Sequence, residues 1–334
     1  MAVVSPLQWL FLSVSLILFL VGSVWFFYPF LSERHYRDGF QYDAMGLYEL
    51  AIRELEQAVR YTPWETQYIM TLAKSYESLA AQASLPIPDR LAALTKAESL
   101  YQDCVDLDSL NPWQQNRLAA VWTARAALLP TQDAQFYLDK ATQAIQLAAR
   151  LDAQNPLFQL NYAHHLHTNN RLDEALPLYL TAIKMDPNMM EARYNLADLY
   201  RRRNRLDLTL LQYQYIYKHN PDFANINVGL ADTYSRLNRI DEAIEAMQRE
   251  VARRPDFVEG ISLLITLHTK RQDWDRVASL YFQLIALNPG SDTFFMPFVD
   301  AVRRSGKVEK AKANLQQMMV QNPNPDLQRL NQLL

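Results

Sequence analysis

The sequence predicts an all-α solenoid built from stacked helix pairs, and three observations carry this prediction. Prolines recur every 34 residues in the C-terminal half, at Pro187, Pro221, Pro255, Pro289 and Pro323, and a fixed period of this length indicates one unit repeated in tandem. Glycine is scarce, with 7 among 334 residues, while 49% of residues are hydrophobic, which is typical of helix-rich proteins with few hairpins. Small and large side chains also recur at fixed positions within each period, as closely packed helices require.

Composition and motifs exclude several classes of function. The formal net charge of −3 gives no sign of a nucleic-acid-binding surface. The single cysteine, Cys104, rules out an intrachain disulfide and a cysteine-based zinc site. The sequence contains no phosphate-binding glycine loop, no H-E-x-x-H and no C-x-x-C motif. We therefore expect a protein that is not an enzyme and that needs no cofactor.

Residues 1–31 are predicted to form a membrane anchor. No charged side chain precedes Glu33, and residues 9–27 form an apolar run that would extend about 28 Å as a helix, close to the thickness of a bilayer core. Pro29 is expected to end this helix. The sequence thus predicts a single-pass protein of the inner or plasma membrane, with a cleaved signal peptide as the alternative. Arginines that follow the span favour the cytoplasmic side for the solenoid over the extracytoplasmic side.

Residues 32–325 divide into eight predicted helix-turn-helix units. Units one to three occupy residues 32–155 and contain extra residues between their helices, whereas units four to eight occupy residues 156–325 and are regular. The tail, 326–334, is long enough for a C-terminal capping helix. Positions within a unit are called places 1 to 34, numbered so that a closing proline such as Pro187 is place 32.

Each unit has small side chains where its two helices approach closely and large ones one turn away. Unit four has Ala163 at place 8, Ala175 at place 20, Tyr179 at place 24 and Ala182 at place 27. This pattern resembles the tetratricopeptide repeat (TPR), which has small residues at places 8, 20 and 27 and proline at place 32. The resemblance implies a right-handed superhelical TPR solenoid. Its concave groove would be lined by the first helix of each unit, at places 2, 5, 6, 9, 12 and 13.

Polar side chains at these places are the candidate partner-binding residues. The resemblance implies that asparagine at place 6, here Asn161 and Asn195, bonds the backbone of a bound peptide. Place 13 carries a row of cations at Arg202, Arg236, Lys270 and Arg304, which would favour acidic peptide segments of a partner protein.

A second interpretation of the cation row is structural. Asp198, Asp232 and Asp300 precede three of these cations by four residues and would pair with them along the helix, each pair contributing only about 0.3–0.5 kcal/mol.

The one cluster of titratable groups is His164, His165 and His167. His164 and His167 are three residues apart and are expected to share a helix face. Solvated histidines in the groove are favoured over a metal site completed by Asp198, because a metal needs further ligands.

These observations predict a membrane-anchored scaffold that binds other proteins through its groove. The segment YTPWETQYIMTLAKSYESLAAQA, the irregular long units and the Asn-Pro breaks resemble the TPR tails of bacterial O-antigen ligase/polymerase-type proteins, which implies a role near surface-polysaccharide assembly. The alternatives are an assembly factor for a membrane redox or photosynthetic complex, and a substrate-positioning subunit of a glycosyltransferase-type enzyme.

Overall fold

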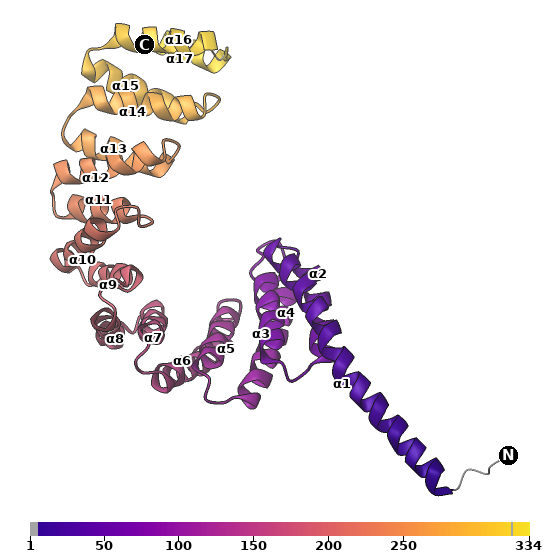
Figure 1. The fold of residues 1–334 in the computed structure, drawn as a ribbon. Coiled ribbons are helices and arrows are strands. Elements are labelled where there is room, and N and C mark those ends of the chain that lie inside the picture. Colours follow the sequence, from indigo (N-terminus) through magenta and orange to yellow (C-terminus); the bar gives the residue numbers. More distant parts are fainter. Residues whose placement is uncertain (1–5, 322) are drawn as a thin grey trace. The chain divides into compact units, whose positions relative to one another are not determined.

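The protein is all-helical in the part of the chain that its structure, a computed structural model, describes. That part comprises residues 6–321 and 323–334, without the side chains of 6–13, 16–21 and 23–26. It contains seventeen α-helices, one short 3-10 helix and no strand (Figure 1). The predicted all-α solenoid of paired helices is therefore confirmed.

The chain forms two compact units, Met1–Asp186 and Pro187–Leu334. In the first unit, consecutive helices pack in pairs, α1 on α2, α3 on α4, α5 on α6 and α7 on α8. The helices of this unit are α1 (Pro6–Ala44), α2 (Tyr48–Tyr61), α3 (Thr66–Ala80), α4 (Ile87–Leu107), α5 (Pro112–Ala126), α6 (Thr131–Leu151), α7 (Pro156–Thr168) and α8 (Leu172–Met185).

The second unit repeats the same pairing, and its last helix packs on α16. Its helices are α9 (Met190–Arg202), α10 (Leu206–His219), α11 (Ile226–Arg236), α12 (Ile240–Arg253), α13 (Val258–Lys270), α14 (Trp274–Leu287), α15 (Phe295–Ser305), α16 (Val308–Gln321) and α17 (Pro325–Leu333), with the 3-10 helix η1 (Asp292–Phe294) before α15. The domain boundaries predicted at residues 155 and 325 and the handedness of the superhelix stay predictions.

The expected membrane anchor is contradicted. Helix α1 does not end at Pro29 but runs through it to Ala44, and the part beyond Phe27 carries charged residues and packs on α2. No helix of the described residues is long and apolar enough to cross a membrane. The prediction of a single-pass membrane protein is therefore wrong, and with it the prediction that such a span orients the solenoid toward the cytoplasmic side has no basis.

The extra residues of units two and three lie largely within helices. Helices α4 and α6, the second helices of these units, each have 21 residues, compared with 14 in α8. Pro86 and Pro130 precede the first residues of α4 and α6, where the absence of a backbone N–H is tolerated. The prediction that the extra residues separate the helices is thus only partly right.

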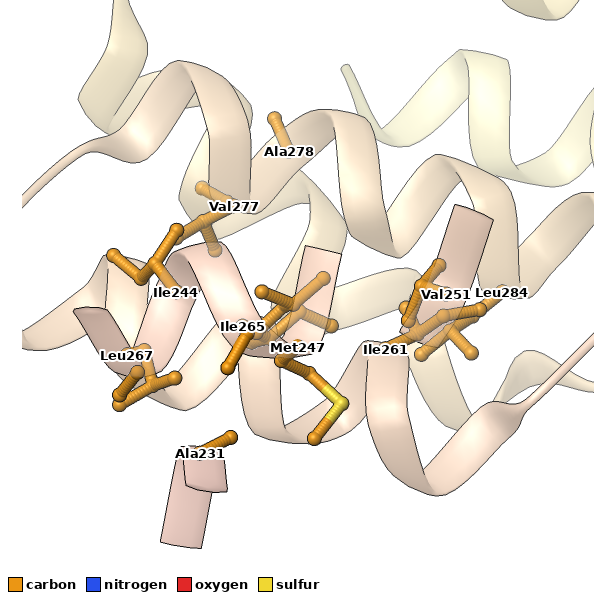
Figure 2. Close-up of a cluster of buried hydrophobic side chains, with 14 of the residues drawn as sticks. Ala231, Ile244, Met247, Val251, Ile261, Ile265, Leu267, Val277, Ala278 and Leu284 are labelled. Atoms are coloured by element: carbon orange, nitrogen blue, oxygen red, sulfur yellow. The ribbon is translucent and has the colours of Figure 1, made fainter. Parts of the chain in front are cut away.

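The core follows the predicted alternation of small and large side chains. In α8, Ala175, Tyr179 and Ala182 are all fully buried, so the alanines admit the first helix closely while the tyrosine fills the space one turn away. Figure 2 shows the corresponding cluster of the second unit, in which apolar side chains of α12, α13 and α14 meet.

Two larger residues at the small places are accommodated by hydrogen bonds. Thr209, at place 20, donates to the backbone oxygen of Arg205 at 3.0 Å. Glu250, at place 27, is 1% exposed and accepts a hydrogen bond from Arg254 at 2.8 Å. Both of these buried side chains therefore have a hydrogen-bond partner, as their burial requires.

The first helices of six units are followed by a residue with positive φ at place 15. Gly46 and Gly306 occupy this place in two units, and Asn170, Asn204, Asn238 and Gln272 adopt the same left-handed conformation in the others, with φ between 57° and 60°. A left-handed residue reverses the chain after a helix. The backbone N–H of Asn204, for example, donates to the Arg201 carbonyl at 3.0 Å.

Candidate ligand-binding groove

The first helices of three consecutive repeats, α9, α11 and α13, line a cavity of about 390 Å³ in the second unit. We call it the α9–α11–α13 groove. Its lining residues are Tyr194, Asp198, Arg201, Tyr213, Val228, Gly229, Asp232, Met247, Phe257, Glu259, Gly260 and Leu263. Most of them occupy places 2, 5, 6, 9 and 12, so the exposed stripe of the first helices forms the groove wall.

Tyr213 of α10 reaches the groove because α11 has a glycine opposite it. A Cβ atom at Gly229 would lie 2.9 Å from the Tyr213 ring, a separation at which one of the two must move. The Tyr213 and Tyr194 rings are 5.5 Å apart between centroids. Burial raises the pKa of both phenols, so both tyrosines are neutral and form an aromatic wall with uncharged hydroxyls.

Arg201 and Asp198 form the polar centre of the groove on α9. The Arg201 guanidinium donates twice to one Asp198 oxygen, and Arg202 donates to the other at 3.0 Å. The hydrogen bond to Asp198 is the largest cause of the raised pKa of Arg201, and the charge of Asp232 contributes least to it. Both charges of the Arg201–Asp198 pair are therefore engaged within α9.

The other two carboxylates of the groove, Asp232 and Glu259, behave differently. Asp232 is half-buried on α11, whereas Glu259 is exposed on α13. Neither side chain makes a hydrogen bond or ion pair with any residue that the structure describes. The groove thus combines an apolar wall with carboxylates that have no cation of their own.

The predicted row of cations lies beside the groove rather than in it. None of Arg202, Arg236, Lys270 and Arg304 lines the α9–α11–α13 groove, where the cation is Arg201, one residue earlier. One residue rotates a side chain by about 100° around a helix, so a shift from place 13 to place 12 changes which side chain faces the groove.

The helical ion pairs expected for this row form in two cases out of three. Asp198 pairs with Arg202 at 3.0 Å, and Asp300 pairs with Arg304 at 2.8 Å. The predicted Asp232–Arg236 pair is wrong, because the Arg236 guanidinium donates to the Asn204 side chain at 3.3 Å. That contact leads Arg236 away from Asp232.

A second cavity, of about 520 Å³, lies in the first unit between α5 and α7. Three alanines of α5, Ala119, Ala120 and Ala124, contribute to its wall, and Asn161, His164 and His165 line it from α7. Asn161 donates to the Asn116 side chain at 3.1 Å. The other predicted asparagine, Asn195, belongs to the second unit, is half-buried and does not line the α9–α11–α13 groove.

The three histidines of α7 do not lie as predicted. His164 is exposed, but His167 is 4% exposed and its Nδ1 is 3.2 Å from the Tyr179 hydroxyl of α8. The prediction that His167 is a solvated groove residue is wrong, because place 12 of this unit faces the second helix.

His165 is the histidine whose position the sequence pattern missed. It is 5% exposed, and its Nε2 is 2.8 Å from the Thr142 hydroxyl. Burial lowers the pKa of His165, with a further contribution from the charge of Arg171, so the imidazole is neutral at pH 7. Among the residues that the structure describes, no three His, Cys, Asp or Glu side chains are grouped to hold a metal ion.

The comparisons with known proteins agree with the repeat pattern. A tetratricopeptide repeat family model matches residues 133–189, 160–222 and 194–256. No curated protein matches the sequence.

Several solved structures are similar to this chain. A thermophilic TPR protein of Thermus thermophilus is 20% identical, with a TM-score of 0.48 over 60% of this chain and 98% of that one. The Pseudomonas aeruginosa PilF structure is 18% identical, with a TM-score of 0.49 over 66% of this chain and 93% of that one. YrrB, described as a TPR protein with an unusual peptide-binding site, is 18% identical, with a TM-score of 0.44 over 65% of this chain and 97% of that one.

The family match lies within the paired helices, and the same places recur in the repeats on either side of it. Helices α9 and α11, which form two walls of the groove, lie inside the matched residues. Residues 133–256 are therefore tetratricopeptide repeats.

Proposed function

We propose that the protein is a non-catalytic scaffold that binds a segment of a partner protein in the α9–α11–α13 groove. The single observation that supports this proposal is the groove itself, a cavity of about 390 Å³ to which three successive repeats contribute. Its walls combine aromatic and aliphatic side chains with a few polar groups, the usual make-up of a binding pocket. A groove that crosses several repeats fits an extended peptide better than a compact metabolite.

Site-specific photo-crosslinking tests this proposal. A photoreactive amino acid replaces Val228, which is half-buried in the groove wall. The control replaces Leu211 of α10, which is 58% exposed and does not line the groove. Both variants are irradiated in the cells from which the protein comes, and the cross-linked products are identified by mass spectrometry.

The expected result is one or a few discrete protein adducts at Val228 that are absent at Leu211. Equal adduct patterns at the two positions, or no adduct at Val228, would contradict docking in the groove. The partner's identity would also separate three roles that stay predictions from the sequence, namely surface-polysaccharide assembly, assembly of a redox or photosynthetic complex, and substrate positioning for a glycosyltransferase.

A further inference from the structure

The α9–α11–α13 groove has a charge opposite to that expected from the cation row. Three carboxylates, Asp198, Asp232 and Glu259, line it together with one guanidinium, Arg201, so its formal charge is −2. None of the cations at place 13 lines the cavity, although Arg202 pairs with the lining carboxylate of Asp198 from beside it.

Arg201 is hydrogen-bonded to only one of the three carboxylates. The guanidinium of Arg201 is held by Asp198, which also accepts from Arg202. Asp232 lies one repeat further along and has no hydrogen-bond or ion-pair partner among the described residues. The nearest candidate cation of its own helix, Arg236, is directed to Asn204. Asp232 is therefore the half-buried carboxylate of the groove that is available to a ligand.

The surroundings of Asp232 are apolar. Tyr213, Val228, Met247, Phe257 and Leu263 line the same cavity, and such walls exclude water when an apolar side chain enters. A cation brought next to Asp232 in this setting would interact more strongly than at a fully solvated surface. An acidic side chain would meet repulsion from Asp232 and Glu259 instead.

We infer that the groove takes an extended partner segment in which a lysine or arginine lies between apolar residues. The basic side chain would pair with Asp232, and its apolar neighbours would pack on the Tyr213, Val228 and Leu263 side of the cavity. This inference rests on the proposed function and gives it a partner class that is opposite in charge to the acidic segments expected from the sequence.

An unbiased peptide selection tests the inference. The full-length protein is immobilised and screened against a phage library of random 12-residue peptides, and the enriched sequences are compared with the input library. The expected outcome is enrichment of lysine or arginine flanked by apolar residues. A synthetic peptide of the enriched sequence should bind Asp232→Asn roughly tenfold more weakly than the unmodified protein, and its affinity should fall as salt is added.

The matched control is Asp207→Asn, which removes the same charge from an exposed residue of α10 outside the groove. This variant should bind the peptide as the unmodified protein does. Circular dichroism of both variants distinguishes a lost contact from a lost fold.

The possible outcomes separate the inference from the proposed function. If the enriched peptides are acidic or neutral, and a Val228→Arg substitution abolishes their binding, the groove docks peptides but the basic-anchor inference is wrong. If Asp232→Asn and Asp207→Asn weaken a basic peptide equally, the effect is one of net charge, and the inference is again wrong. If no enriched peptide depends on Val228, both the inference and the proposed docking function fail.

Discussion

Replacing Gln272 with glycine is expected to stabilise the α13–α14 helix pair by about 0.5–1 kcal/mol. Gln272 adopts φ of 59° between these helices, and its exposed side chain makes no hydrogen bond with any described residue. A non-glycine residue in this conformation costs about 1–2 kcal/mol. Glycine removes that cost, but it also makes the unfolded chain more flexible, which lowers the free energy of unfolding by about 0.4–1 kcal/mol.

Hydrogen exchange measured by mass spectrometry on the full-length protein is the appropriate assay, because repeat proteins open locally rather than in one step. Amides of α13 and α14 should exchange roughly two- to fivefold more slowly in Gln272→Gly than in the unmodified protein. The control is Thr269→Gly, an exposed position inside α13, where glycine should lower protection by a similar amount. Faster exchange in Gln272→Gly, or the same change in both variants, would refute the argument from backbone conformation.

Three further predictions concern buried polar groups. Because burial lowers the pKa of His165 below its ordinary 6.5, the unfolded chain binds a proton that the native protein does not. The stability that neutral His165 allows is therefore present above pH 6.5 and is lost as the pH falls, by at most about 1.4 kcal/mol per pH unit. Thermal melts should show that the melting temperature falls less between pH 7.5 and 5.5 in His165→Gln than in the unmodified protein. Glu250→Ala leaves Arg254, which is 43% exposed, without its buried partner. Urea unfolding should then show a free energy of unfolding that is lower by about 1–3 kcal/mol. An unchanged midpoint would show that the pair contributes nothing to stability. Burial raises the pKa of Cys104 to about 12, so a thiol reagent at pH 7.5 should label it only once the protein is unfolded, and rapid labelling of the native protein would contradict its burial.

The repeat period predicted where the groove lies but not which charges face it. The chain has arginine at 201, 202 and 203, and the 34-residue spacing favoured Arg202 because Arg236, Lys270 and Arg304 continue the same row. Spacing alone cannot distinguish a cation that faces the groove from one directed along the helix edge. Arg201 and Arg202 both pair with Asp198, so the distinction depends on the face of the helix on which each side chain lies, and the packing of the neighbouring repeats decides which face lines the groove.

Helix ends show a similar division between what the sequence predicts and what it does not. Asn170, Asn204 and Asn238 are themselves 34 residues apart, and asparagine tolerates the left-handed conformation, so the end of the first helix was predictable in those repeats. Gln272 carries no such preference, and only the surrounding repeat imposes its conformation. The prediction that Pro29 ends the first helix was wrong, because α1 continues through it although a proline removes one hydrogen bond from a helix.

Place 12 explains why neighbouring repeats with one pattern have different grooves. In α7 this place holds His167, which turns to the place-24 tyrosine of its own repeat, Tyr179, at 3.2 Å and is buried. In α9 it holds Arg201, whose charge is compensated by Asp198 at place 9 rather than by the tyrosine at place 24. An arginine cannot be buried against a phenol without a large desolvation cost, so it stays at the groove wall and engages the acid of its own helix. The acid one repeat later, Asp232, then has no arginine at its own place 12, where the residue is Ser235. The exchange of one residue type at place 12 thus replaces a buried contact with the second helix by a charged side chain at the groove wall. The carboxylate of the next repeat, Asp232, has no hydrogen-bond or ion-pair partner among the described residues, and this is the feature from which a basic partner segment follows.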